Sequence, residues 1–237
     1  MATLTAKQHP GSRRDTGNDL LARAKSASVS AVKDRLQAFS KAHAAFLKAD
    51  DAVQAADRAA ITAQAKLGEA DAVHDECVES LAKAAIGEGA NRTSPFKAWK
   101  GPTTTELKAG AAVPSAKASK RLAGAITKDK TAGKQTKGAA VLLDKAAAGV
   151  ITAAGPLEAA LEKRRVAIAA RDGLASAWEK TFAVLKRGAR AASDDSKNAG
   201  LFDALFAVSA GEKKSPKKAK AAKAAGGNVV PGDAANG

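Results

Sequence analysis

The stretch "FSKAHAAFLKADDAVQAADRAAITAQAKLGEADAVHDECVESLAKA", residues 39–84, decides the fold of this chain. It contains no proline, and large or mixed residues recur every seven positions beside a column made almost entirely of alanine. Such a sustained heptad repeat predicts one long helix, over about residues 19–86, packed along another helix. The first column comprises Val32, Phe39, Phe46, Val53, Ala60, Leu67, His74 and Leu81. The second comprises Ala42, Ala49, Ala56, Ala63, Ala70, Cys77 and Ala84.

A helix of that length needs a partner, because at about 1.5 Å per residue it would be roughly 100 Å long with a continuous apolar stripe. A second apolar stripe between residues 138 and 192 supplies the partner, although Pro156 must either begin a helix or kink one. We expect a continuous but kinked or broken second arm. The stripe comprises Leu157, Leu161, Ile168, Ala175, Trp178, Phe182, Leu185 and Ala189.

Composition supports a helical fold. The chain has 237 residues, of which 45% are apolar, mostly alanine, and only 3% are aromatic. A thick core of large side chains is therefore excluded, and closely packed helices are favoured. We predict an all-α fold, a long antiparallel alanine-rich coiled-coil hairpin whose arms span 19–86 and 138–192.

A basic insert, residues 87–137, separates the two arms. Glycines and prolines from Gly87 to Pro114 end the first helix. Thr103 followed by Glu106 is a capping box for a short helix, and Ser115 is a second candidate start. We expect the insert at one end of the rod.

Both ends of the chain have too few apolar residues to form a stable core. We expect a disordered arm over residues 1–18, a turn and short amphipathic helix over 193–211, and a disordered lysine-rich tail over 212–237. The amphipathic helix either docks on a protein or granule surface or folds back over the bundle end. Its apolar side chains are Leu201, Phe202, Leu205 and Phe206.

The charge of the chain is concentrated. Net charge is +15 with a pI near 10.0, and the insert alone has eleven Lys and Arg against three acids. We therefore expect a polyanion partner, DNA or RNA, with Trp99 available to stack on a base. The alternative is that Phe96 and Trp99 plug the hairpin end beneath ordinary solvated lysines. The candidate binding residues of the insert are Arg92, Lys97, Trp99, Lys100, Lys117, Lys120, Arg121, Lys128 and Lys130.

The tail carries further candidates: Lys213, Lys214, Lys217, Lys218, Lys220 and Lys223. Ser215-Pro216-Lys217-Lys218 matches the SPKK element of histone H1 tails, and "KKAKAAKAA" resembles the repeats of H1-like bacterial nucleoid proteins and of phasins, which coat polyester granules. The first resemblance implies salt-sensitive DNA binding, and the second implies granule coating. A tail that only improves solubility is the remaining alternative.

Signals for catalysis and metal binding are poor. Asp71, His74 and Cys77 recur every three residues, but His74 and Cys77 also fit the helical seam, and only His9 and His43 remain as further imidazoles. No Walker, nucleophile-elbow, dinucleotide or CxxC motif occurs. We therefore expect no enzyme activity, no cofactor and no metal.

Two functions remain. The first is a sequence-nonspecific nucleic-acid-binding or nucleoid-associated protein. The second is a structural scaffold, assembly or granule-coating protein that acts through helix contacts. In either case we expect a homo-oligomer, because a rod of only two helices leaves apolar side chains along its edges exposed to water. The single cysteine, the absence of a signal-peptide pattern and the lack of a membrane-length apolar run predict a cytoplasmic protein without a transmembrane segment.

Overall fold

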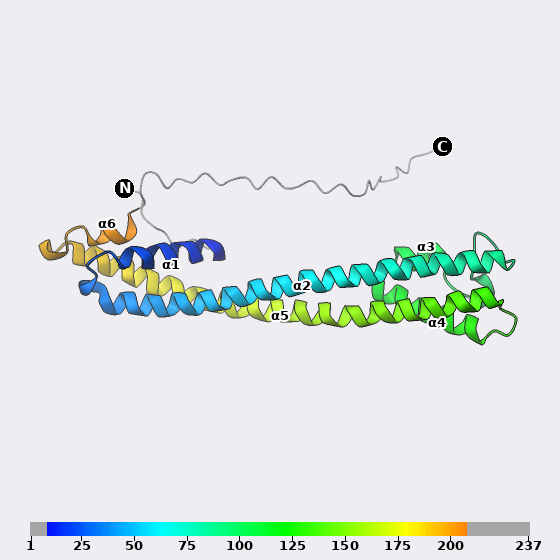
Figure 1. The fold of residues 1–237 in the computed structure, drawn as a ribbon. Helices are drawn as coiled ribbons and strands as arrows, with labels where there is room; N and C mark the ends of the chain where they lie inside the picture. The colour runs from blue at the N-terminus through cyan, green and yellow to red at the C-terminus, as the bar shows by residue number, and fades with distance from the viewer. Residues whose placement is uncertain (1–8, 208–237) are drawn as a thin grey trace, which may run out of the picture.

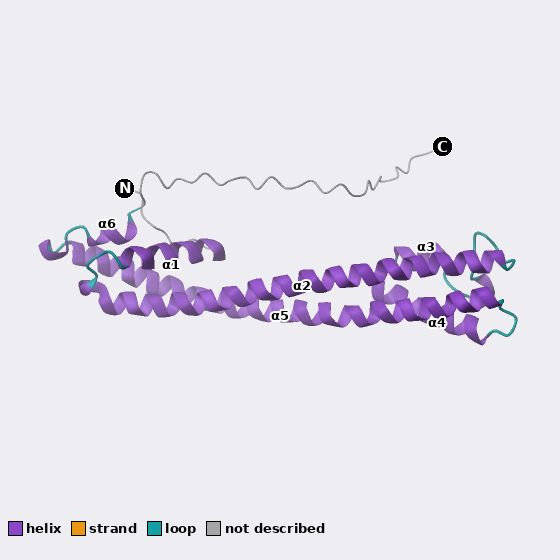
Figure 2. Ribbon diagram, viewed as in Figure 1, coloured by secondary structure: helices purple, strands orange, loops and turns teal. Residues whose placement is uncertain are grey.

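The structure is a computed structural model that describes residues 9–207, and the regular elements in that range are all helices (Figure 2). The expected all-α fold is confirmed. Figure 1 shows α2 and α5 side by side and running in opposite directions. The helices are α1 (Pro10–Ala24), α2 (Lys33–Gly87), α3 (Thr104–Ala109), α4 (Ala112–Lys128), α5 (Lys134–Ser193) and α6 (Leu201–Phe206), with 3-10 turns at Ser30–Val32, Lys97–Trp99 and Ser196–Asn198.

The second arm is a single helix. As expected for a continuous arm, α5 runs as one helix of 60 residues through Pro156 and is not broken there. Proline removes the hydrogen bond to the carbonyl four residues earlier, at Thr152. Both residues are exposed, so water can satisfy that carbonyl, and burial on the opposite face holds the helix together.

The amino-terminal part of the chain differs from the prediction. Residues 10–18, expected to be disordered, belong to α1, and the expected helix from residue 19 is interrupted over 25–32. That segment, "KSASVSAV", is rich in serine, whose hydroxyl competes for backbone groups; Ser26 Oγ donates to the carbonyl of Arg23 at 3.0 Å. Leu20 and Ala24 hold α1 in the core. Residues 1–8 lie outside the described range.

The predicted seam of α2 faces its partner. Every residue of the first column is buried except Leu67, which is half-buried. In the alanine column Ala63 is buried and the others are half-buried. The heptad pattern therefore identified correctly the face that α2 turns toward the rest of the protein.

The core is divided between the two ends of the rod. One cluster lies where α1 and α6 cover the beginning of α2 and the end of α5, and it includes Phe39, Phe46 and Trp178. Two further clusters lie where α3 and α4 cover the other end: one contains Leu81 and Leu143, and the other contains Val150. Between them α2 and α5 have no third helix against them (Figure 1).

Candidate polyanion-binding surface

The insert folds against the end of the rod where α2 is followed by α3, α4 and the start of α5 (Figure 1). The predicted capping box is present: the Thr103 hydroxyl accepts from the Glu106 amide at 3.2 Å, and Glu106 Oε2 accepts from the Thr103 amide at 2.7 Å. The next helix begins at Ala112, earlier than the expected Ser115. Buried apolar side chains fix the insert on the rod: Phe96, Leu107, Leu122, Ala123 and Ile126.

The two aromatic residues of the insert differ in how deeply they are buried. Phe96 is 1% exposed and plugs the end of the core, as the alternative interpretation of the aromatics proposed. Trp99 is only partly buried, and its indole N–H donates to Asp129 Oδ2 at 2.8 Å. Its ring lines a surface pocket of about 310 Å³ that brings together two of the predicted basic residues, Lys100 and Arg121.

The three acids of the insert all accept hydrogen bonds from backbone amides. Glu88 accepts from the amides of Gln135 at 2.9 Å and Thr136 at 3.3 Å, which caps the first turn of α5. The backbone amide of Thr103 is the main cause of the lowered pKa of Glu106. The pKa of Asp129 is also lowered, first by the Thr131 amide, then by the Thr131 hydroxyl and the Trp99 indole. None of the three forms an ion pair within residues 9–207.

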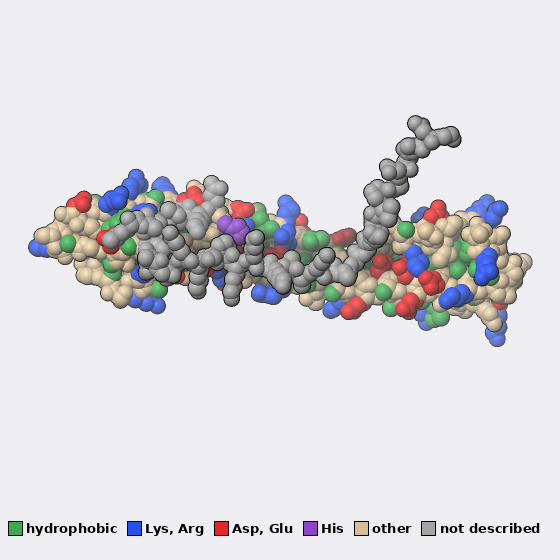
Figure 3. All heavy atoms as spheres, turned by 90° about the horizontal axis from the view of Figure 1, so that it is seen from above, with side chains coloured by type: hydrophobic (Ala, Val, Ile, Leu, Met, Phe, Trp, Pro, Cys, Tyr) green, Lys and Arg blue, Asp and Glu red, His purple; other side chains and the backbone are tan. Residues whose placement is uncertain are grey.

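Most basic residues of the predicted site are exposed and, within the same range, form no ion pair. Lys120 is the exception, because it pairs with Asp144 at 3.0 Å. The remaining exposed set comprises Arg92, Lys97, Lys100, Lys117, Arg121, Lys128 and Lys130. Figure 3 shows basic side chains on this end of the molecule, and on the opposite end as well.

Three of these cations share one face of α4. Lys117, Arg121 and Lys128 are spaced four and seven residues apart, which places them in one row over about 16 Å of helix. The opposite face of α4 is buried, with Ser119 and Leu122 turned inward. The structure therefore brings part of the predicted site into a stripe beside the Trp99 pocket, whereas Arg92 and Lys97 lie in the loop before α3 and do not line the pocket.

The predicted docking residues are not free for a partner. Leu201, Phe202, Leu205 and Phe206 are all buried in the cluster with α1, α2 and α5. The rings of Phe206 and Phe182 are 5.7 Å apart, and Ser193 Oγ accepts from the Phe202 amide at 2.7 Å. Of the two alternatives, docking on a partner or folding back over the bundle end, the structure shows the second, with Phe182 of α5 packed against the apolar face of α6.

The predicted lysines of the tail, Lys213, Lys214, Lys217, Lys218, Lys220 and Lys223, lie outside the described residues. The last described residue follows α6, at the end of the rod opposite α3 and α4 (Figure 1). The two basic regions that we predicted are therefore attached at opposite ends of the hairpin.

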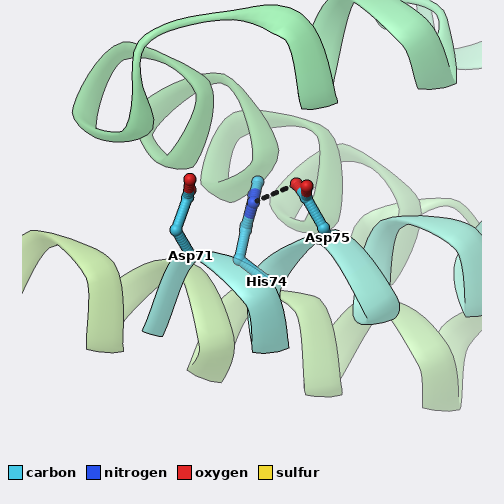
Figure 4. Close-up of side chains that lie close together, drawn as sticks. All are labelled: Asp71, His74 and Asp75. Atoms are coloured by element: carbon cyan, nitrogen blue, oxygen red, sulfur yellow. Dashed lines mark ion pairs between the residues drawn. The ribbon is translucent and has the colours of Figure 1, made fainter. Parts of the chain in front are cut away.

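One group of side chains has the composition of a metal site. Asp71, His74 and Asp75 place their nitrogen and oxygen atoms within 4.8 Å of one another (Figure 4). The sequence pattern suggested Cys77 as the neighbour of His74, whereas the structure brings Asp75 there. Sequence reasoning also missed Ser119 and Asp129, which contact His74 and Trp99 from distant positions.

One helix of the described chain, α5, is long enough to cross a membrane and contains an 18-residue window of mean hydropathy 1.4. This is weak evidence, because core helices of soluble proteins have the same properties. Along much of its length α5 packs against α2. The absence of a transmembrane segment and the cytoplasmic location stay predictions.

Comparison with known proteins adds no family. No protein-family model, curated protein or solved structure matches this chain. Function is therefore inferred from its residues and their geometry.

Proposed function

We propose that this is a non-enzymatic, sequence-nonspecific nucleic-acid-binding protein of the nucleoid-associated kind, with its main phosphate contacts on α4 and the adjoining loops. One observation carries the proposal. The acids of the insert are engaged in capping and turn hydrogen bonds, while eight of its Lys and Arg side chains, the seven predicted ones and Lys134, are exposed without an ion pair in the described range. Cations left unpaired in this way neutralise phosphates and carry no information about base sequence.

The stripe on α4 suits an extended phosphate backbone. Its length of about 16 Å corresponds to about five phosphates along one strand, at about 3.4 Å of axis per phosphate. Trp99, which is partly exposed and lines the same pocket as Arg121, offers an aromatic ring for stacking with an unpaired base. The lysine tail, with its resemblance to H1-like proteins, adds a second basic region, which is joined to the chain after α6, at the other end of a rod about 80 Å long. This separation favours bridging of two segments of nucleic acid.

The test is a salt titration of binding to short duplex DNA by fluorescence anisotropy. The variant K117Q/R121Q/K128Q removes the stripe, and K41Q/K48Q/K66Q removes the same charge from exposed positions of α2. We plot the logarithm of the DNA association constant against the logarithm of the salt concentration. The stripe variant should reduce the magnitude of this slope by about 2 to 3, because each phosphate contact contributes about 0.9 to it. The α2 control variant should change this slope much less.

Truncation after Gly211 measures the contribution of the tail in the same assay. If the full chain shows no DNA binding at about 50 mM salt, where nonspecific contacts are strong, the proposed function is wrong. Equal losses in the stripe variant and in the α2 control would show that net charge alone, and not α4, attracts the DNA.

A second candidate function, a scaffold or granule coat, is supported by the exposed apolar side chains in the middle of the rod. Large apolar side chains are exposed where only two helices pack: Ile61 is 70% exposed, Val166 55% and Leu161 49%. Such a face suits self-association into a four-helix arrangement. Sedimentation of wild type and I61E/V166E tests this self-association: a wild-type oligomer that the variant converts to monomer supports it, and a monomeric wild type contradicts it.

A further inference from the structure

His74 is a completely buried histidine with one unsatisfied nitrogen. It lies on α2 against α4, with a side chain that is 0% exposed. Its Nε2 is 2.8 Å from the Ser119 hydroxyl, whereas its Nδ1 has no hydrogen-bond partner. A buried polar atom without a partner costs about 1 to 3 kcal/mol, so an additional ligand for Nδ1 would relieve that cost.

Two carboxylates flank this nitrogen. Asp71 and Asp75 lie one helical turn apart on either side of His74, and Asp75 Oδ1 is 3.6 Å from Nδ1 (Figure 4). Both carboxylates are partly buried. Like charges at this spacing destabilise a helix by a few tenths of a kcal/mol, which a bound cation would reverse.

We propose that Asp71, His74 and Asp75 form a binding site for a divalent transition-metal ion of the Zn²⁺ type. One imidazole nitrogen and two carboxylate oxygens form the three-ligand set of an open zinc site, at bond lengths of about 2.0 to 2.2 Å, with water completing the tetrahedron. The nitrogen ligand disfavours Ca²⁺ and Mg²⁺, which prefer oxygen. Because both aspartates are only partly buried, rotation of their side chains can bring the oxygens from within 4.8 Å of the other ligand atoms to coordination distance.

Ser119 provides the supporting contact that such a site needs. A metal on Nδ1 requires the proton on Nε2, and Nε2–H can then donate to Ser119 Oγ at the observed 2.8 Å. Ser119 is itself 0% exposed and belongs to α4. The metal would therefore fix the His74 ring and strengthen the contact between α2 and α4.

Metal binding by the full chain tests the assignment. We expect about one Zn²⁺ per chain, measured by competition with a chromogenic chelator, and no competition by excess Ca²⁺. In D71N/D75N the affinity should fall at least tenfold, because two of three ligands lose their charge. S119A should weaken binding about tenfold or more, as expected for a partner of a ligating histidine. The control E69Q/E76Q, which removes two exposed acids of the same helix, should bind as wild type does.

Co²⁺ identifies the ligands independently. Its visible absorption should report nitrogen and oxygen ligands without a thiolate charge-transfer band, because Cys77 does not belong to the group. The assignment is overturned if wild type binds no Zn²⁺, if D71N/D75N binds it as tightly as wild type, or if a thiolate band appears and C77S removes it.

Discussion

The end of the rod that carries α1 and α6 and its middle are built from the same two long helices, yet they bury their side chains very differently. At the end, Phe39, Phe46 and Trp178 are completely buried. In the middle, Ile61 and Val166 are more than half exposed. The difference shows that an alanine-rich helix pair covers only its own seam. Large side chains are buried where a third or fourth helix adds a layer.

Two histidines on α2 show the same contrast at the scale of one side chain. His43 has both nitrogens engaged: Trp178 Nε1–H donates to Nδ1 at 3.0 Å, and Nε2–H donates to Asn18 Oδ1 at 3.0 Å. By contrast, at the end of the rod that carries α3 and α4, Nδ1 of His74 has no hydrogen-bond partner and lies beside two carboxylates. We infer a structural role for His43 and a ligand-binding role for His74.

The largest effect should come from Trp178→Ala. Trp178 is 0% exposed, its ring stacks on that of Phe182 with 5.1 Å between the centroids, and its indole N–H donates a hydrogen bond to His43. Truncation therefore leaves a cavity and a His43 Nδ1 without a donor. We expect a loss of about 3 to 5 kcal/mol in the free energy of unfolding, measured by urea denaturation followed by far-UV circular dichroism. Ile61→Ala in the exposed middle is the matched control and should cost less than about 1 kcal/mol. Similar losses in both variants would contradict the contrast between end and middle.

A pair of glycine substitutions should give smaller effects of opposite sign. A Cβ at Gly17 would overlap the His43 ring, which two hydrogen bonds hold in place, so Gly17→Ala should destabilise the protein by about 1 to 3 kcal/mol. A Cβ at Gly149, an exposed position of α5 with no proline beside it, meets no side chain or other helix within 4 Å, so Gly149→Ala should stabilise the protein by about 0.5 to 1 kcal/mol through helix propensity. Thermal unfolding of both variants measures the signs, and stabilisation by Gly17→Ala would show that α1 does not pack closely here.

The smallest effect should come from mild acid, which adds one proton to His43. Burial, and secondarily the charge of Arg14, lowers the pKa of His43 below its ordinary 6.5. The unfolded chain therefore binds this proton more readily than the folded chain, and stability is full above pH 6.5 and falls as pH decreases through the folded pKa. Urea midpoints between pH 7.5 and 5 should show this decline, and His43→Gln should reduce it. A decline of the same size in the variant would assign the titration to another group.

Several features of the fold followed from particular residues. The heptad columns identified the inward face of α2, and Thr103 with Glu106 identified the start of α3. The break before Lys33 was missed, because "KSASVSAV" contains no glycine or proline and its serines disfavour a helix only weakly. The second arm continues through Pro156, because tertiary packing on the buried face of α5 outweighs one lost hydrogen bond.

The candidate sites were predicted less completely. Clustering of lysine in the insert was visible in the sequence, but it took the structure to show that the face shared by Lys117, Arg121 and Lys128 is the exposed face of α4. Asp129, 30 residues from Trp99, and Ser119, 45 residues from His74, have no local signal that links them to their partners. The LFxxLF pattern was compatible with docking and with folding back, and only the rings around Phe182 decided between them.

The sequence by itself determined that this protein is helical, where its long seam lies and where its positive charge is concentrated, because periodicity and charge are properties of neighbouring residues. The tertiary structure decided which basic residues remain without an ion pair, which apolar residues stay exposed and which histidine nitrogen has no hydrogen-bond partner. Those properties depend on contacts between residues far apart in the chain, and no local pattern encodes them.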